Sequence, residues 1–436
     1  MRCLICNVPF NLTVLNKNYI NNFVVFLILL LVAISCVTVY DTISNRNYAH
    51  QYNPGLTPFH PEYGILMTSA TDNRLFFRFF PNEFAFLVAE GDSVPKAHIR
   101  FFFRTTKSYQ SIEIVDSLTA LFTLKGKPRP QFMGYVPLQF TEKGKYIIEV
   151  FLTDLNSGQS VSQVLDVDFN PEGNQNSFLF LSQHANPIFY NHFSAMDTFR
   201  VRSDHFNPSG IRLSYYQADT SLPVAPDIQK ETYLVPMDID TSYIVPHPDT
   251  CLFSFNKKGV YFFSDTMGIH GKTYLCANEF YPYLKTPEEL LRPLGYLCSD
   301  KEMQAYWQLG SPKLAVDSFW LTAANDVDKA RELIRIYYHR VQLANYYFTD
   351  FKEGWLTDRG MIYIIFGAPG EVRKTDDGEF WNYGRDSKDG LEFYFYNEYH
   401  PLFGKTSYLE RSDLHARLWF NAITTWREGR VFTLNQ

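Results

Sequence analysis

The segment with the clearest potential for chemistry is the Gly-rich stretch EGWLTDRGMIYIIFGAPGEV at residues 353–372. Such a stretch could bind a phosphate if backbone amides and a lysine converged on it, as in a P-loop that leads through Lys-Ser/Thr into a helix. Here the loop is too short, Lys374 lies too far along the chain, and Pro369 removes one of the amides. The sequence therefore argues against a nucleotide site and indicates no cofactor.

Three charged residues of the same segment, Asp358, Arg359 and Glu371, could form an ion-pair cluster of the kind that a hydrolase uses. The chain has no Gly-x-Ser-x-Gly elbow, and its eleven histidines are scattered without an obvious serine or cysteine partner. Turn acceptors and a structural ion pair are the simpler interpretation. We therefore predict no catalytic residues, and a hydrolase built on Asp358 and Glu371 stays open as a third class of function.

The sequence predicts no metal site. It contains no His-Glu-x-x-His pattern, no EF-hand loop and no Cys/His cluster. His184 and His192 flank the stretch ANPIFYN, but each stands alone. The acidic stretch TDDGEF at residues 375–380 lacks the spacing of a calcium loop, and we interpret it as a solvated hairpin.

Aromatic side chains are the remaining candidates for ligand contact, since the chain has 39 Phe, 29 Tyr and 6 Trp. In the C-terminal third, exposed rings would stack on sugars or peptides, whereas buried rings would be core, which is the commoner outcome. The residues proposed for such a surface are Trp381, Tyr383, Trp419 and Trp426.

The elements that must position these residues are mainly strands in the first two thirds of the chain. Between residues 61 and 170, short aromatic and β-branched runs such as AHIRFFFRTT and KYIIEVFLTD are separated by turn residues, and the pattern repeats over 171–282. We predict a mainly β fold with two immunoglobulin-like β-sandwiches, followed by an α+β C-terminal domain. A single sandwich of twice the size is the alternative.

Helical signals begin near residue 283. Thr286-Pro287-Glu288-Glu289 is typical of a helix start, and an apolar stripe predicts a longer helix over 326–350. We expect Gly354 to end that helix in the left-handed conformation and MIYIIF, residues 361–366, to form a central strand. Residues 412–428 predict an amphipathic helix with Leu414, Leu418, Ala422 and Trp426 on one face.

The segment GWLTDRGMIYIIFGAPGEV, with YYHRVQLANYYF before it and FWNYG after it, closely resembles the GWxTD domain of bacterial envelope proteins. Met361 and Gly370 depart from the family pattern, which has Arg and Asp there. The resemblance covers about residues 283–411 and implies a GWxTD domain over 283–436, often preceded by paired sandwiches. Besides two isoleucines, the matching positions are Gly354, Trp355, Thr357, Asp358, Arg359, Gly360, Tyr363, Gly367, Pro369 and Glu371.

The N-terminus predicts a signal peptide over residues 1–35. Arg2 and Lys17 precede the twelve-residue apolar run FVVFLILLLVAI, which is too short to span a bilayer. The following Ser-Cys resembles a Bacteroidota lipobox and predicts lipidation of Cys36, with residues 36–60 as a tether. An uncleaved anchor or an ordinary cysteine is the alternative.

Charge and cysteine usage add two further expectations. The formal net charge is −6 and no Lys/Arg cluster occurs, so we expect no nucleic-acid partner. Beyond Cys36 the chain keeps Cys251, Cys276 and Cys298, which allow at most one disulfide.

Together these features predict a non-enzymatic lipoprotein held in the outer membrane of a Bacteroidota-type cell through acylated Cys36. It would face the periplasm, with the cell surface as the other possibility. Its expected role is that of a scaffold or accessory subunit, with protein partners in an assembly for outer-membrane protein insertion or export. The alternative is a glycan- or peptide-binding lipoprotein that uses its aromatic C-terminal domain.

Overall fold

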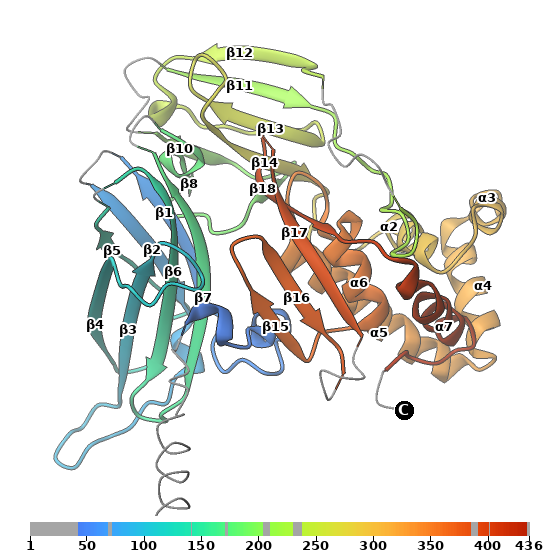
Figure 1. Cartoon of the computed structure of the whole chain (residues 1–436), viewed down its shortest axis with the longest axis horizontal. Helices are drawn as coiled ribbons and strands as arrows, with labels where there is room; N and C mark the ends of the chain where they lie inside the picture. The colour runs from blue at the N-terminus through green and yellow to red at the C-terminus, as the bar shows by residue number, and fades with distance from the viewer. Residues whose placement is uncertain are drawn as a thin grey trace, which may run out of the picture. The chain divides into compact units, whose positions relative to one another are not determined.

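The computed structural model describes residues 42–68, 72–140, 142–170, 173–203, 210–229, 238–384, 391–400 and 402–433 (Figure 1). The predicted signal peptide and Cys36 lie outside these ranges. Residues Thr42–Gln436 belong to one compact unit. No helix within the described ranges has the length and apolar character needed to cross a membrane.

The first β region consists of two antiparallel sheets that share one core. Phe77 of one sheet packs against Phe101 of the other in a tilted arrangement, with 4.9 Å between the ring centroids. Tyr146, Ile148, Val150 and Leu152 are fully buried, as their alternation predicts. The turn at residues 156–158 joins two strands as expected, with Gly158 at φ +76°. One sheet has the order β1 (Glu62–Met67), β2 (Asn73–Phe79), β5 (Phe132–Leu138), and the other β4 (Asp116–Lys125), β3 (Lys96–Thr106), β6 (Gly144–Asp154), β7 (Ser160–Phe169).

The second β region has a two-stranded and a five-stranded sheet around a core of aromatic rings, among them Phe180, Phe199 and Phe263. The strands β9 (His192–Ser194) and β14 (Gly271–Ala277) pair in parallel, whereas the other strand pairs of this region are antiparallel. The small sheet pairs β8 (Leu179–Ser182) with β10 (Phe199–Arg202), and the larger has the order β12 (Thr241–Val245), β11 (Ile211–Tyr216), β13 (Gly259–Ser264), β14 (Gly271–Ala277), β9 (His192–Ser194).

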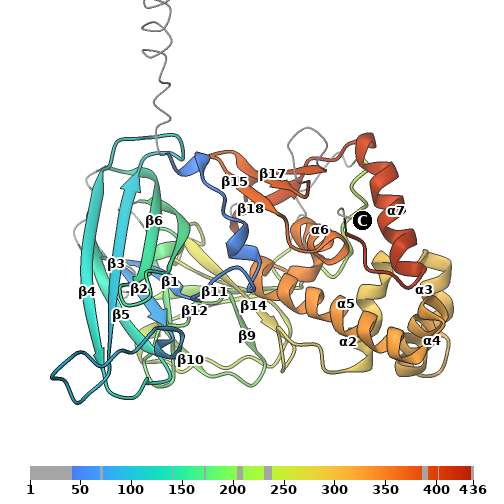
Figure 2. The same ribbon diagram turned by 90° about the horizontal axis from the view of Figure 1, so that it is seen from below.

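The C-terminal region contains helices and one antiparallel sheet, and Figure 2 shows α6 lying between α5 and that sheet. The two predicted helix starts are confirmed. Thr286 and Glu289 form a capping box, and Asp326 accepts the amide of Lys329. The helices are α2 (Pro287–Leu291), α3 (Asp300–Trp307), α4 (Pro312–Ala324), α5 (Val327–Phe348), α6 (Asp358–Phe366) and α7 (Ala416–Arg427), and the sheet runs β15 (Glu371–Lys374), β16 (Gly378–Asn382), β17 (Glu392–His400), β18 (Gly404–Leu409).

The prediction of a strand at residues 361–366 is wrong, because these residues belong to helix α6. Every residue from Met361 to Phe366 is buried, so the run has no polar face whose period could separate helix from strand. The role expected for Gly354 is also wrong. Helix α5 ends at Phe348, and Gly354 begins the 3₁₀ turn η8 (Gly354–Leu356) without a positive φ.

Residues 42–60 are not a tether, and we call them the N-terminal strap. They form the 3₁₀ turns η1 (Ile43–Asn45) and η2 (Ala49–Tyr52), and they bury Tyr48 and Tyr52 completely or nearly so. The Tyr48 hydroxyl donates to Glu149 of β6 at 2.8 Å, while the Tyr48 amide donates to the carbonyl of Val372 in β15 at 2.8 Å. The strap thus joins the first β region to the C-terminal sheet.

Replacing Tyr52 with Phe is expected to lower the free energy of unfolding by about 2 kcal/mol, since a buried hydrogen bond to a charged group is lost. The Tyr52 hydroxyl donates to the Glu379 carboxylate at 2.9 Å, and its ring packs on Trp381. Urea denaturation of the full chain measures the change. Tyr399→Phe, at a site 65% exposed, is the matched control. Equal losses in the two variants would contradict the strap's role.

Candidate functional site

Two glycines of the Gly-Trp-x-Thr-Asp segment occupy points where backbones touch. A Cβ on Gly354 would lie 2.1 Å from the Ala344 carbonyl oxygen of α5, and a Cβ on Gly360 would lie 2.0 Å from the Gly354 carbonyl oxygen. Neither glycine has a positive φ. These positions therefore require glycine for space, and they let η8 lie directly against α5 and the first turn of α6.

Trp355 is a residue of η8, is 2% exposed and helps to pack this turn against α5. Its amide donates to the Asn345 side-chain oxygen at 3.0 Å, its carbonyl accepts the Tyr296 hydroxyl at 2.6 Å, and its indole N–H donates to Glu353 at 2.5 Å. The Arg292 guanidinium lies 5.1 Å from the centre of its ring. Each polar atom of Trp355 therefore has a partner within the fold.

Asp358 is held by a buried bidentate ion pair with Arg411. The Asp358 oxygens lie 2.7 Å from Nη2 and 3.1 Å from Nη1 of Arg411, and Oδ2 also accepts the amide of Leu409 at 2.8 Å. The two side chains are 6% and 1% exposed. Thr357, the N-cap of α6, accepts the amide of Gly360 at 3.0 Å. Asp358 therefore fixes α6 to the end of β18, with both of its carboxylate oxygens bonded within the protein.

The other two charged residues considered for the cluster, Arg359 and Glu371, lie in separate ion pairs. Arg359 contacts Glu379 at 3.5 Å, and Glu371 pairs with its neighbour Arg373 at 2.9 Å near the surface. Burial alone would raise the pKa of Glu379, but the cations of Lys374 and Arg359 lower it to about 2. The structure thus does not bring Asp358, Arg359 and Glu371 together, and the cluster considered for a hydrolase is absent from the described residues.

The remaining motif residues complete the route from α6 into β15. Gly367 ends α6 with φ +88°, and its amide donates to the Tyr363 carbonyl at 2.8 Å. Pro369 is buried in the turn that follows. The Tyr363 hydroxyl donates to the Tyr52 carbonyl at 2.8 Å, so the strap also contacts the motif.

The aromatic residues proposed for ligand binding do not form an exposed surface. Trp381 and Trp426 are 0% exposed, and the Trp426 indole donates to the Ile365 carbonyl at 3.0 Å. The Tyr383 hydroxyl donates to the Gly367 carbonyl at 2.9 Å, and Trp419 is half-buried against Phe366. The predicted ligand contact through Trp381 and Trp426 is therefore wrong, because both rings belong to the core. Leu414, expected on the buried face of the last helix, is 85% exposed and precedes α7.

Cysteines and metal-ligating groups offer no further site in the described ranges. Cys251, Cys276 and Cys298 are all free thiols. Burial raises the pKa of Cys276 to about 11 and that of Cys298 to about 12, so both thiols are protonated at neutral pH. No group of three His, Cys, Asp or Glu side chains in this part of the chain has the arrangement of a metal site.

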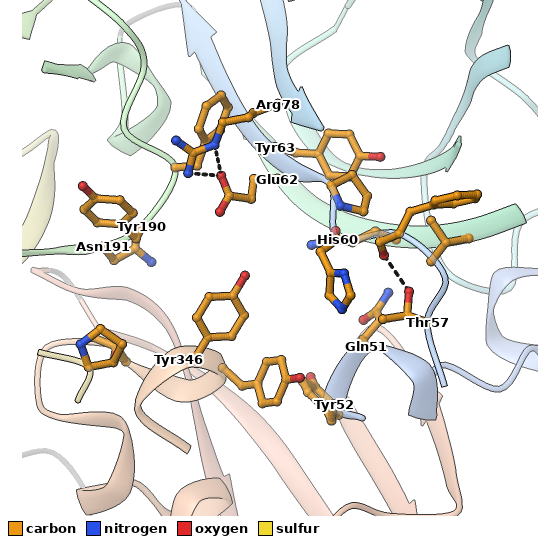
Figure 3. Close-up of a pocket in the computed structure, with 18 of the residues that line it drawn as sticks. Gln51, Tyr52, Thr57, His60, Glu62, Tyr63, Arg78, Tyr190, Asn191 and Tyr346 are labelled. Carbon is orange, nitrogen blue, oxygen red and sulfur yellow. Dashed lines mark hydrogen bonds and ion pairs between the residues drawn. The ribbon is translucent and has the colours of Figure 1, made fainter. Parts of the chain in front are cut away.

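The structure does contain a cleft of about 650 Å³ that sequence reasoning missed (Figure 3). Its walls come from the strap, from β1, β2 and β7, from residues 189–192, from residues 281–283 and from the end of α5. No motif joins these distant segments, so only the general richness in tyrosine hinted at it. The tyrosines that line the cleft are Tyr52, Tyr63, Tyr190, Tyr281, Tyr283, Tyr346 and Tyr347.

His192, on one wall of this cleft, gives a pH-dependent prediction. Burial lowers the pKa of His192 from 6.5 to about 4, and the nearby Asp197 carboxylate opposes this only partly. The unfolded chain therefore takes up a proton near pH 6.5 and the folded chain only near pH 4, so the histidine destabilises the fold as the pH falls between these values.

His192→Gln removes this titration. The free energy of unfolding of the variant minus that of the natural chain should be larger at pH 5 than at pH 7. Urea denaturation of both proteins at the two pH values measures this difference. A difference between the two proteins that does not change with pH would contradict the assignment.

Comparison with known proteins identifies one region of the chain. Residues 259–428 match the family model of the GWxTD domain, so the match begins with β13, ahead of the expected boundary at residue 283. No curated protein matches the chain. One similar solved structure is the β-glucuronidase of Bacteroides uniformis, with 13% identity and a TM-score of 0.18 over 34% of this chain and 15% of that enzyme. This chain thus spans a small part of that enzyme's length, and its own residues 259–428 form a GWxTD domain.

Proposed function

We propose that this protein is a non-enzymatic lipoprotein that serves as a scaffold or accessory subunit of a cell-envelope assembly. The observation that carries the proposal is that the polar side chains of the motif are bonded to other residues within the fold. Asp358 forms an ion pair with Arg411 and accepts the amide of Leu409, and Arg359 pairs with Glu379. The backbone of Trp355 is hydrogen-bonded to the side chains of Asn345 and Tyr296. A motif that places its reactive groups in the core fits a structural element rather than an active site.

The two β regions suit a modular scaffold, and we propose that both are immunoglobulin-like sandwiches. In the first, a sheet of order β1-β2-β5 shares a core with a sheet of order β4-β3-β6-β7. This is the order of an immunoglobulin-like fold whose fourth strand lies in the second sheet. In the second, β12-β11-β13-β14 repeats the four-strand order, and β10 pairs with β8.

The location proposed for the protein is the outer membrane of a Bacteroidota-type cell, facing the periplasm, with acyl chains on Cys36 as the anchor. The support is the apolar run before Ser35-Cys36. The partners proposed are subunits of a machine for outer-membrane protein insertion or export.

Affinity purification of the tagged full chain from detergent-solubilised membranes tests the proposal, with mass spectrometry of the N-terminus and of copurifying chains. We expect a diacylated Cys36 at the mature N-terminus and a membrane partner in stoichiometric amount. The variant Cys36→Ser should lose the acyl mass and the membrane association. A lipidated protein that elutes alone would contradict the scaffold role, and an unmodified Cys36 would contradict the anchor.

A further inference from the structure

The cleft of Figure 3 has the size and walls of a binding site for a small or linear ligand. Its volume of about 650 Å³ falls within the usual range of ligand pockets, about 300–1,000 Å³. The strap forms one wall and is itself fixed, since the His50 ring lies 2.6 Å from the Ser162 carbonyl of β7 and Tyr52 bonds to Glu379. We propose that this cleft binds an uncharged oligosaccharide.

Exposed tyrosine rings supply the first part of the argument. Tyr190 is 42% and Tyr346 is 54% exposed, and Figure 3 shows these two rings entering the cleft from different segments of the chain. Within the described ranges, neither hydroxyl has a hydrogen-bond partner. A phenol ring offers an apolar face for the C–H face of a pyranose, and its hydroxyl both donates and accepts hydrogen bonds. Tyr63 and Tyr347 likewise keep their hydroxyls without a partner in this part of the chain.

The lysine and the arginine that line the cleft are paired with acids of the protein. Arg78 and Glu62 form a direct ion pair, His60 contacts Glu83 at 2.7 Å, and Lys374 contacts Glu379 at 3.6 Å. Asp197, the remaining acid, accepts the amide of Ser194 at 2.7 Å. His192 is neutral at physiological pH because its ring is largely buried against Tyr190 and Tyr281. Among the described residues, the lining therefore presents no unpaired lysine or arginine that would select an anionic ligand.

Amide side chains supply the remaining polar contacts. Asn191 is exposed beside Tyr190, and Figure 3 shows its amide in the cleft. Gln51 donates to the Ser162 carbonyl over a long 3.5 Å contact, so its side-chain oxygen stays available. Amides present a donor and an acceptor side by side, which matches the neighbouring hydroxyls of a sugar. Aromatic faces, neutral amides and paired cations together favour an oligosaccharide over an anionic ligand.

Isothermal titration calorimetry on the full chain tests this inference, in a zwitterionic detergent that carries no sugar head group. The probes are maltohexaose, cellohexaose, xylohexaose and chitohexaose, with tetragalacturonate as the charged comparison and an extended hexapeptide library as the other class. We expect saturable binding of at least one neutral hexasaccharide and none of tetragalacturonate. Tyr346→Ala and Tyr190→Ala should each weaken binding about tenfold, because each removes a stacking face worth about 1.4 kcal/mol.

Tyr243→Ala is the matched control, since Tyr243 is 50% exposed on β12 and lies outside the cleft. It should change the affinity less than about twofold, and unchanged urea midpoints would show that all three variants fold. Three results would overturn the inference: no binding of any neutral hexasaccharide, binding that Tyr346→Ala and Tyr190→Ala leave intact, or Tyr346-dependent binding of peptides alone. The result of this titration is independent of the affinity purification that tests the proposed function, because the purification uses none of these sugars or peptides.

Discussion

Replacing Gly360 with Ala is expected to lower the free energy of unfolding by about 3 kcal/mol or more. The new methyl group would lie 2.0 Å from the Gly354 carbonyl oxygen, and this neighbour is backbone that cannot rotate away. Helix α6 and the turn η8 would have to separate, which strains the packing on α5. Gly354→Ala should act in the same direction, because its Cβ would lie 2.1 Å from the Ala344 carbonyl oxygen. Urea denaturation followed by tryptophan fluorescence measures both changes.

Gly370→Ala is the matched control within the same segment. Its Cβ would lie 3.6 Å from the nearest heavy atom, the Asn382 carbonyl oxygen, and its φ is not positive. The substitution should therefore change the stability by less than about 0.5 kcal/mol. Equal stability of the Gly360→Ala and Gly370→Ala proteins would contradict the close backbone contact.

Replacing Asp358 with Ala is expected to cost about 3–5 kcal/mol, because it leaves the guanidinium of Arg411 buried without its counter-ion. Arg411 is 1% exposed at its side chain, and the Leu409 amide loses its acceptor in the same variant. The loss should appear as a lower urea midpoint. It should also appear as faster hydrogen exchange in α6 and β18, the elements that this carboxylate joins.

Asp328→Ala is the control for loss of an acid. The Asp328 side chain is 87% exposed and pairs with Arg331 one turn along α5, so its removal should cost less than about 1 kcal/mol. If Asp358→Ala were as mild as this control, the carboxylate would not hold the domain together, and a chemical role for it would need a new argument.

Elements with a clear period could be predicted from the sequence. The stripe that includes Ala330, Tyr337, Val341 and Ala344 indicated a long helix, and α5 buries all four residues. The alternation in β6 indicated a strand, and the structure confirms the strand and the burial of its apolar face. The opposite face of β6 is also largely buried, with Ile147 and Glu149 among its residues, which the alternation did not indicate.

Segments buried on all sides could not be predicted in this way. The run from Met361 to Phe366 reads equally as strand or helix. The local signs of the helix were at its ends, in the cap at Thr357, the first-turn acid Asp358 and the terminal Gly367. The strap looked like a linker because 3₁₀ turns leave no period. Its burial depends on Glu149 and Glu379, which lie far away in the sequence.

The predictions for individual site residues were limited for the same reason, since the sequence does not show which distant residues meet. Trp381 and Trp426 could not be assigned to core or surface from composition, since a tryptophan serves in either place. The sequence identified Asp358 as part of a motif but gave no sign of Arg411, which lies 53 positions along the chain. The cleft requires segments that are far apart in the sequence to meet, and no spacing rule describes that.

A double-mutant cycle between Asp358 and Arg411 tests most directly whether the Gly-Trp-x-Thr-Asp motif is a structural element. The variants are Asp358→Ala, Arg411→Met and the double substitution, measured by urea denaturation of the full chain. We predict that the double variant loses about 2–3 kcal/mol less stability than the sum of the single losses, because neither buried charge is left alone. Single variants of natural stability whose effects add to within about 0.5 kcal/mol would contradict the structural role of the motif.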